Sequence, residues 1–276
     1  MIIAIFTNEC PIQNALVYKI IKDIEIDTVF KSRNIINNLT KKSFLYYLKR
    51  LIRIPFEMPF RLAWNRLIKV YHKKYPYIST EVKQYLVNNI NDDIVIRYIK
   101  ERKPELIVVS ATTMVKDEII NEAKNINCLI LNLHTGVSPY IKGGPNCTNW
   151  CLSNNYYLIG NTIMRLDIGI DSGAIIATEC TILNGDESLF ELHYKVMEHG
   201  FDLYLRVISC YRRDKTLLNA TSQDDISQNT TLFYTKDWTI TKVIKAYYNY
   251  KFFYKKGINS FKLDYNIKLF PFVCKE

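Results

Sequence analysis

Short, continuous apolar runs alternate with amphipathic segments in the first half of the chain, and this alternation limits the folds open to it. The clearest runs are Glu105–Ala111 and Cys128–Leu133, with shorter ones at Ile2–Phe6 and Ile26–Phe30. Runs without polar alternation are typical of strands buried on both faces, as in parallel sheets covered by helices. The intervening segments have the three- and four-residue periodicity of helices. The pattern predicts an α/β fold with a mostly parallel sheet.

Periodicity and capping signals predict the remaining elements. Helices are expected at Cys10–Asp23, from Asp92 or Asp93 to just before Pro104, at Lys116–Lys124, at about Ser188–Arg213 and near 238–255. Strands are expected at Val87–Ile90, in two neighbouring runs after Leu158 and at Phe261–Phe272. The polar stretch Asn219–Thr231 is interpreted as a linker.

One segment departs from the alternation. From Lys41 to Lys74, aromatic and aliphatic residues recur at helical spacing with Lys and Arg between them, which predicts two helices broken near Pro55–Pro59 and inserted at the edge of the sheet domain. The apolar stripe of this segment is expected to be packed; its members are Phe44, Leu48, Leu51, Phe60, Trp64 and Leu67.

The positive charge of the chain is concentrated in that segment. Between Lys31 and Tyr75 there are twelve Lys or Arg residues and one acid, Glu57, which gives +11, whereas the rest of the chain carries −1 of the total of +10. Three interpretations stay open: a solvated helix face, a patch for nucleic acid or membrane, and a rim that attracts an anionic substrate. The solvated face is favoured, because long basic side chains commonly cover helix surfaces.

Length and composition suit a soluble cytoplasmic protein with one large domain or a main domain and a small appendage. No apolar stretch reaches the ~18 residues of a spanning helix, and the first ten residues lack the basic start of a signal peptide. The seven cysteines are expected to be reduced. Cys147 and Cys151 are interpreted as buried apolar side chains and not as a zinc site, so no metal is expected.

Three polar residues are candidates for catalysis. Asn132 and His134 stand two apart at the end of an apolar strand, so their side chains share one face, at the edge where ligand crevices form in parallel sheets. Asp171 lies between Gly169 and Gly173 in a turn. An amide that stabilises an oxyanion, an imidazole that exchanges protons and a carboxylate that orients it fit acyl transfer to an amine.

The surrounding segment resembles the formyltransferases that use N10-formyltetrahydrofolate. The resemblance covers roughly residues 86–215, and the matching motifs are Asn132-Leu133-His134, Pro139, Lys142-Gly143, Pro145, Gly160-Asn161-Thr162-Ile163 and Asp167-Ile168-Gly169-Ile170-Asp171-Ser172-Gly173. It implies a Rossmann-like catalytic domain over residues 1–215, with a basic helical insertion at about 33–75, and a C-terminal extension over 216–276. Two departures, Thr135-Gly136-Val137 and Lys142, affect the region expected to hold the acceptor.

By this resemblance, Asn132, His134 and Asp171 match the catalytic triplet of the family. The cofactor N10-formyltetrahydrofolate is expected to contact a stretch after the central strand and the Asp167 turn; these residues are Thr113, Met114, Val115, Asp167, Gly169 and Ile170. Asp167 is otherwise interpreted as a turn-former.

Family members formylate glycinamide ribonucleotide, initiator methionyl-tRNA or nucleotide-linked amino sugars. About sixty residues follow Arg213, which fits poorly with the C-terminal barrel of the tRNA enzymes. The expected acceptor is therefore a nucleotide-linked amino sugar, a dTDP-3- or 4-amino-dideoxyhexose, contacted by Lys142, Tyr234 and Trp238. Simple packing of Tyr234 and Trp238 is an equal alternative.

Two other functions remain open: a methionyl-tRNA formyltransferase, or a non-catalytic relative that docks on a membrane or a partner. Nucleic acid is not expected as a partner. The amine position, the base and the oligomeric state, including a homodimer, are left open.

Overall fold

The computed structural model describes residues 1–33, 44–76, 82–144, 146–154, 157–215, 218–226, 230–264 and 268–274, with 44–50 and 260–264 as backbone only. Of the motif residues, Pro145 lies outside the described part, as do the side chains of Phe44 and Leu48 in the predicted stripe.

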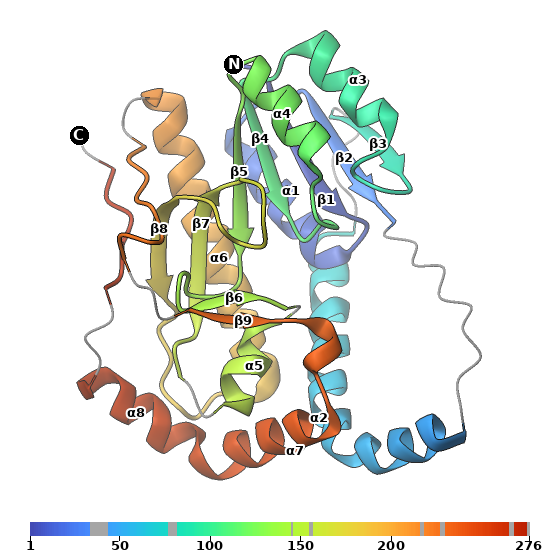
Figure 1. The fold of residues 1–276 in the computed structure, drawn as a ribbon, viewed down its shortest axis with the longest axis vertical. Coiled ribbons are helices and arrows are strands. Elements are labelled where there is room, and N and C mark those ends of the chain that lie inside the picture. The colour runs from blue at the N-terminus through green and yellow to red at the C-terminus, as the bar shows by residue number, and fades with distance from the viewer. Residues whose placement is uncertain are drawn as a thin grey trace.

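A seven-stranded sheet forms the centre of the molecule, in the order β3-β2-β1-β4-β5-β7-β8 (Figure 1). Its strands are β1 (Ile3–Asn8), β2 (Thr28–Ser32), β3 (Lys83–Val87), β4 (Leu106–Ser110), β5 (Leu129–His134), β7 (Gly160–Arg165) and β8 (Ile175–Cys180). The first five strands in this order are mutually parallel, and β7 and β8 are antiparallel additions. The α/β prediction with a mostly parallel sheet is confirmed. The strand predicted at Val87–Ile90 instead ends at Val87.

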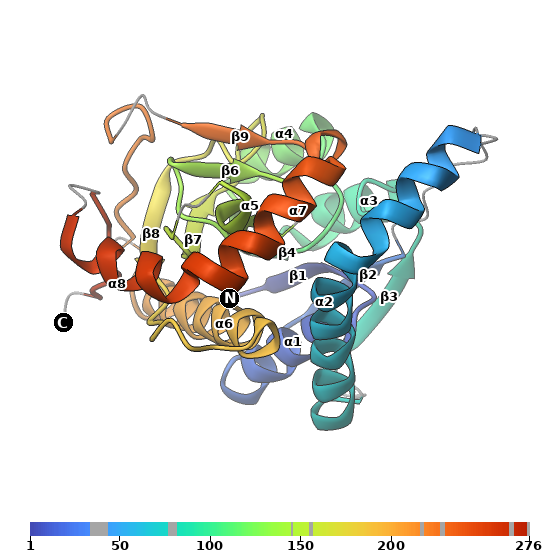
Figure 2. The same ribbon diagram turned by 90° about the horizontal axis from the view of Figure 1, so that it is seen from below.

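Helices cover both faces of this sheet, as the continuous apolar runs require. Helices α1 (Pro11–Asp23) and α6 (Leu189–Arg213) lie on one face, and α3 (Asp93–Arg102) and α4 (Asp117–Asn125) on the other (Figure 2). In β1, Ile3 and Ile5 join the buried cluster of α1 and α6, whereas Ala4 and Phe6 join the cluster of α3 and α4. The helix predicted at about Ser188–Arg213 is α6, and it begins with a capping box formed by Ser188 and Glu191.

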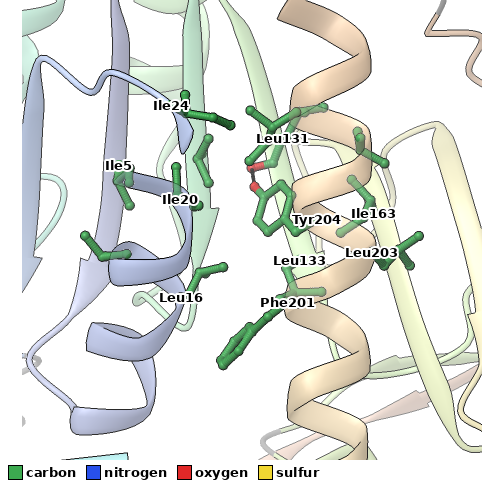
Figure 3. Close-up of a cluster of buried hydrophobic side chains, with 14 of the residues drawn as sticks. Ile5, Leu16, Ile20, Ile24, Leu131, Leu133, Ile163, Phe201, Leu203 and Tyr204 are labelled. Atoms are coloured by element: carbon green, nitrogen blue, oxygen red, sulfur yellow. Dashed lines mark hydrogen bonds between the residues drawn. The ribbon is translucent and has the colours of Figure 1, made fainter. Parts of the chain in front are cut away.

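The core between α1, α6 and the sheet contains a buried phenol that links two strands. Figure 3 shows Tyr204 of α6 pointing at β5, where its hydroxyl donates to the Leu131 carbonyl at 2.6 Å. The same hydroxyl accepts from the Val109 backbone N–H of β4 at 3.0 Å. Burial raises the pKa of this phenol, so it remains a neutral donor. Tyr204 therefore fixes β4 against β5 just before the position of Asn132.

The basic insertion forms one helix, α2 (Phe44–Lys74), so the prediction of two helices broken near Pro55–Pro59 is wrong. Both prolines lie inside it, and Figure 1 shows the helix bent within its first half. Proline removes a helical hydrogen bond and bends a helix. Here the chain stays helical beyond the bend, because α2 packs against α1, α6 and α7. In the predicted stripe, Phe60 and Leu67 are buried and Trp64 is partly buried, but Leu51 is exposed.

The C-terminal residues add a second layer below the sheet (Figure 1). The element β6 (Ile141–Gly143) pairs with β9 (Thr231–Phe233), and α5 (Cys147–Ser153) packs on α7 (Ile240–Tyr248). A π-helical turn η3 (Asn249–Phe253) connects α7 to α8 (Tyr254–Asp264), and a 3₁₀ turn, η2, spans Thr235–Asp237.

The strand predicted at Phe261–Phe272 is wrong. Helix α8 continues through Asp264, and Phe270 forms an isolated bridge with Thr178. Part of the predicted linker Asn219–Thr231 is ordered against the core: Thr221 bridges Ile175, and Gln223 is buried, while residues 227–229 lie outside the described part.

One pair of cysteines corrects the prediction that all seven are reduced. Cys210, on α6, and Cys274 form a disulfide, because the C-terminal tail returns to lie beside α6. Cys147 and Cys151 are buried, as predicted. Within the described residues there is no group of His, Cys, Asp and Glu arranged to hold a metal ion, and no helix of the length and apolarity that crossing a membrane requires.

Candidate active site

The candidate site begins at the carboxyl end of β5. Leu131 and Leu133 pack on the α1 and α6 side, and Ile130 belongs to the opposite cluster. Because side chains alternate along a strand, Asn132 and His134 share the face of Ile130. Asn132 pairs with Val109 in the parallel register of β4, so both residues lie at the edge where the parallel strands end.

The turn after β7 brings a carboxylate to this strand end. His134 Nδ1 lies 3.2 Å from Asp171 Oδ2, and the backbone N–H of Gly143 donates to the same oxygen at 2.8 Å. Asp171 has φ +45°, in the left-handed region that few non-glycine residues adopt, although Asp does so more often than most. The Gln223 side chain donates to the carbonyls of Asp171 and Gly173 at 2.7 and 2.8 Å, which stabilises that turn.

The other imidazole nitrogen also contacts an acceptor. His134 Nε2 lies 3.0 Å from the carbonyl of Ile141 and 3.7 Å from Cys147 Sγ. Burial disfavours the charged ring, but the charge of Asp171, the Cys147 contact and the Ile141 carbonyl together raise the pKa of His134 to about 10. The direction of this shift favours the protonated imidazolium form of the ring beside Asp171.

Two acids of the same turn have different environments. Asp171 faces His134, whereas Asp167 is exposed, 3.0 Å from Lys124 Nζ, and accepts from the Ile168 N–H at 2.9 Å. These two contacts lower the pKa of Asp167. A Cβ at position 173 would approach the Arg165 carbonyl oxygen to 1.7 Å, so only glycine permits this close return of the chain. The geometry agrees with the interpretation of Asp167 as a turn-former.

A cavity of about 510 Å³, here called the catalytic cavity, brings the three predicted catalytic residues together. Asn132, His134 and Asp171 line it, and so do Asn8 and Gln13 from the end of β1 and the start of α1. Asn8 and Gln13 were not predicted from the sequence. Asn8 could have been predicted, because it ends a strand at the same edge of the sheet, and a position at a strand end is the signal that identified Asn132.

A second cavity of about 390 Å³, the cofactor cavity, lies next to it. The lining includes every residue predicted to contact the cofactor, namely Thr113, Met114, Val115, Asp167, Gly169 and Ile170. Asn132 and Asp171 line both cavities, so groups bound in the two cavities would meet at these side chains.

A third cavity of about 430 Å³, the tryptophan cavity, lies between α2, α5 and the C-terminal layer. Trp64, Trp150 and Trp238 line it, and Trp64 also lines the catalytic cavity. Trp238 packs edge-to-face on Trp150 at 4.8 Å, so the expectation of simple packing is also met in part. Tyr234 is exposed, with Lys236 Nζ 5.2 Å from its ring, and neither Tyr234 nor Lys142 lines any of these three cavities.

Two lining residues had no distinguishing signal in the sequence. Trp64 was assigned to a packed stripe of the insertion, and Thr235 belongs to the C-terminal extension, yet Thr235 lines both the cofactor and the tryptophan cavities. Their position depends on how α2 and the C-terminal layer fold back on the sheet domain.

A protein-family model matches the segment of the chain that contains Asn132, His134 and Asp171. Residues 63–208, more than half of the chain, match the family model described as formyl transferase. The chain belongs to the formyl transferase family.

Two sequence relatives are methionyl-tRNA formyltransferases. That of Finegoldia magna is 34% identical over 126 residues, which are 45% of this chain and 39% of the relative. That of Clostridium beijerinckii is 30% identical over 132 residues, 48% of this chain and 42% of the relative. The matched region thus spans about two fifths of the length of these relatives.

Solved structures with the same fold include two that are described as N-formyltransferases. A 4-N formyltransferase from Francisella tularensis has a TM-score of 0.54 at 17% identity and covers 88% of this chain and 86% of its own. An N-formyltransferase from Helicobacter canadensis, in complex with folinic acid and dTDP-3-aminofucose, has a TM-score of 0.55 at 15% identity, with 90% and 81% covered. At these identities the likeness shows the fold.

Proposed function

We propose that this protein transfers a formyl group from N10-formyltetrahydrofolate to the amine of a nucleotide-linked amino sugar, a dTDP-3- or 4-amino-dideoxyhexose. The observation that carries the proposal is the junction of two cavities at Asn132 and Asp171, with the His134–Asp171 pair beside it. One cavity suits the folate and the other the acceptor, so donor and acceptor would meet beside the three polar side chains.

The chemistry assigns a role to each of these side chains. The acceptor amine attacks the formyl carbon, and the Asn132 amide donates a hydrogen bond to the oxyanion that forms. Asp171 holds Nδ1 of His134, so proton exchange is assigned to Nε2, which must leave its contact with the Ile141 carbonyl at 3.0 Å to reach the substrates. The imidazolium gives a proton to the departing nitrogen of the folate and recovers one from the attacking amine, which balances the transfer.

The tryptophan cavity supports an acceptor that carries an aromatic base. Trp64 and Trp238 are partly buried and offer aromatic surface beside the catalytic cavity, whereas Trp150 is 2% exposed and stacks on Phe233 at 4.6 Å. Stacking on aromatic side chains binds nucleic-acid bases whatever their identity. Asn149 Oδ1 is buried there without a hydrogen-bond partner among the described residues, and Arg61 adds a positive charge suited to a diphosphate. Contact of Lys142 and Tyr234 with the acceptor remains a prediction outside this cavity.

The same proposal takes residues 1–215, with the insertion at about 33–75, as the catalytic domain and residues 216–276 as an extension. The extension contributes Thr235 and Trp238 to the cavities beside the site, which supports a role in acceptor binding.

A methionyl-tRNA acceptor is the second candidate, because the sequence relatives carry that name. The C-terminal barrel expected of tRNA enzymes has no counterpart in the described residues after α6, where β9 is the one strand and has three residues.

A formylation assay over dTDP- and UDP-amino sugars, glycinamide ribonucleotide and methionyl-tRNA tests the proposal. The expected result is turnover of one or more nucleotide amino sugars that depends on N10-formyltetrahydrofolate. Turnover of methionyl-tRNA alone would support the second candidate, and no formylation of any acceptor would contradict both.

A further inference from the structure

An exposed apolar surface lies on the side of the molecule where α2 bends and the C-terminal helices run. On α2, Leu51, Met58 and Leu62 follow helical spacing, and Leu51 and Leu62 are 63% and 60% exposed. On the π-helical turn, Phe252 is 61% exposed and Phe253 is exposed as well. Large apolar side chains grouped in this way on a surface mark a contact site.

Aromatic contacts join α2 to α7 and to Phe252 of the π-helical turn on this side of the molecule. The ring of Phe56 on α2 lies 5.7 Å from Tyr247 and 6.3 Å from Tyr248 on α7, and Tyr248 stacks on Phe252 at 5.7 Å. Figure 2 shows α7, α8 and the first part of α2 together on the near side of the molecule. We call this the basal surface; its exposed members are Leu51, Ile52, Met58, Arg61, Leu62, Lys245, Tyr248, Lys251, Phe252, Phe253, Lys255 and Lys256.

The charge of the basal surface has a single sign. Between Ile240 and Leu263 the chain has six lysines and no acidic residue. Between Phe44 and Leu62 it has four basic residues and Glu57, which is neutralised by Arg53 at 3.0 Å. Exposed lysines of the C-terminal helices thus lie on the same side of the molecule as exposed leucine, methionine and phenylalanine, and this is the composition of helices that lie at a membrane interface.

We propose that the basal surface docks this protein on an anionic membrane surface. Leu51, Met58 and Phe252 enter the boundary between headgroups and acyl chains, and Lys251, Lys255 and Lys256 stay at the headgroups. Attraction of this kind adds to apolar burial and is screened by salt. Positive charge argues against a second copy of the chain as the occupant, because two such surfaces repel each other.

Co-flotation of the full chain with vesicles tests the proposal. Phosphatidylcholine vesicles with and without phosphatidylglycerol separate the apolar and the electrostatic contributions. The wild type is expected to bind the anionic vesicles at 0.1 M salt and to dissociate as the salt rises. The reversal K251E/K255E/K256E is expected to lower partitioning about a hundredfold or more, and L51S/F252S to abolish binding.

Matched controls come from α3, which lies at the opposite end of the molecule from α7 in Figure 1. The variants I94S and R97E/K100E/K103E change exposed residues of the same types there and are expected to bind vesicles as the wild type does. No flotation of the folded wild type, equal loss in the α3 variants, or sedimentation as a dimer that L51S/F252S dissociates would overturn the proposal. The vesicle assay needs no formylation, so its outcome is independent of the proposed function.

Discussion

The crevice at the end of β5 and the tryptophan cavity beside it satisfy their polar groups in different ways. In the crevice, both His134 nitrogens face acceptors, and one oxygen of Asp171 binds both a nitrogen of His134 and a backbone N–H. In the tryptophan cavity, the oxygen of Asn149 is buried without a hydrogen-bond partner among the described residues. The protein itself thus holds the His134–Asp171 pair in place, whereas acceptors without a partner among the described residues remain for a ligand at Asn149 in the tryptophan cavity and at Asn8 in the catalytic cavity.

The largest expected effects are in the crevice. We expect His134→Ala and Asp171→Asn each to lower kcat by about two orders of magnitude or more, the scale of a lost acid–base group. Asn132→Ala is expected to cost about 10²–10³ in kcat, because it removes an oxyanion donor. These losses are measured by steady-state kinetics with the acceptor that the formylation assay described above identifies.

Asp167→Asn is the matched control for Asp171→Asn, since it changes the exposed acid of the same turn. Its effect on kcat should be milder. If His134→Ala or Asp171→Asn folds normally and turns over at nearly the wild-type rate, the proposed acid–base mechanism is contradicted.

Smaller effects, on binding and not on the chemical step, are expected in the tryptophan cavity. Trp238→Ala should raise KM for a nucleotide-linked acceptor about 10- to 100-fold with little change in kcat, because it removes a stacking surface. The exposed Tyr234→Ala, four residues earlier and outside the cavity, is the control. An unchanged KM together with a lowered Tm would show that Trp238 only packs on Trp150.

Charge reversal on α2 distinguishes the sugar and tRNA acceptors. Lys49→Glu, Arg50→Glu and Arg53→Glu together should change formylation of a dTDP-amino sugar less than tenfold, because steering of two phosphates acts on the association rate. The wild-type protein is not expected to shift the electrophoretic mobility of tRNA. A tRNA site would instead give tight binding that falls with log[salt] at a slope near −0.9 per phosphate contact.

Arg53 needs its own control in that variant, because it also binds Glu57 and donates to the Trp238 carbonyl at 3.3 Å. The double variant at Lys49 and Arg50 leaves these contacts in place. A loss of sugar turnover confined to the triple variant would therefore indicate displacement of Trp238 and not lost steering.

The smallest effect concerns stability and pH. The pKa of His134 is raised from 6.5 to about 10 in the folded protein, so its ion pair stabilises the fold fully below pH 6.5 and loses that contribution as pH rises toward 10. Urea unfolding of the wild type and His134→Gln should therefore show a larger difference in free energy at pH 6.5 than at pH 9.5. An equal difference at both pH values would mean that His134 is not charged in the fold.

Much of the sheet domain was predictable from local pattern. Continuous apolar runs identified β1, β2, β4 and β5, because a strand covered on both faces needs apolar side chains throughout. Period-two alternation placed Asn132 and His134 on one face, and the glycines around Asp171 indicated the turn that brings it to them. These inferences depend on neighbours in sequence, where strand geometry is fixed.

The tertiary structure alone decided what surrounds that site. Pro55 and Pro59 predict a break, but packing against α1, α6 and α7 keeps α2 one helix. Trp64 and Thr235, about 170 residues apart, meet at the same cavity, and Cys210 pairs with Cys274 across the return of the tail. The sequence alone identified four strands of the sheet and placed the candidate residues Asn132 and His134 on one strand face, because both depend on a short repeating geometry. The cavities and the basal surface depend on distant segments folding together, which no local pattern encodes.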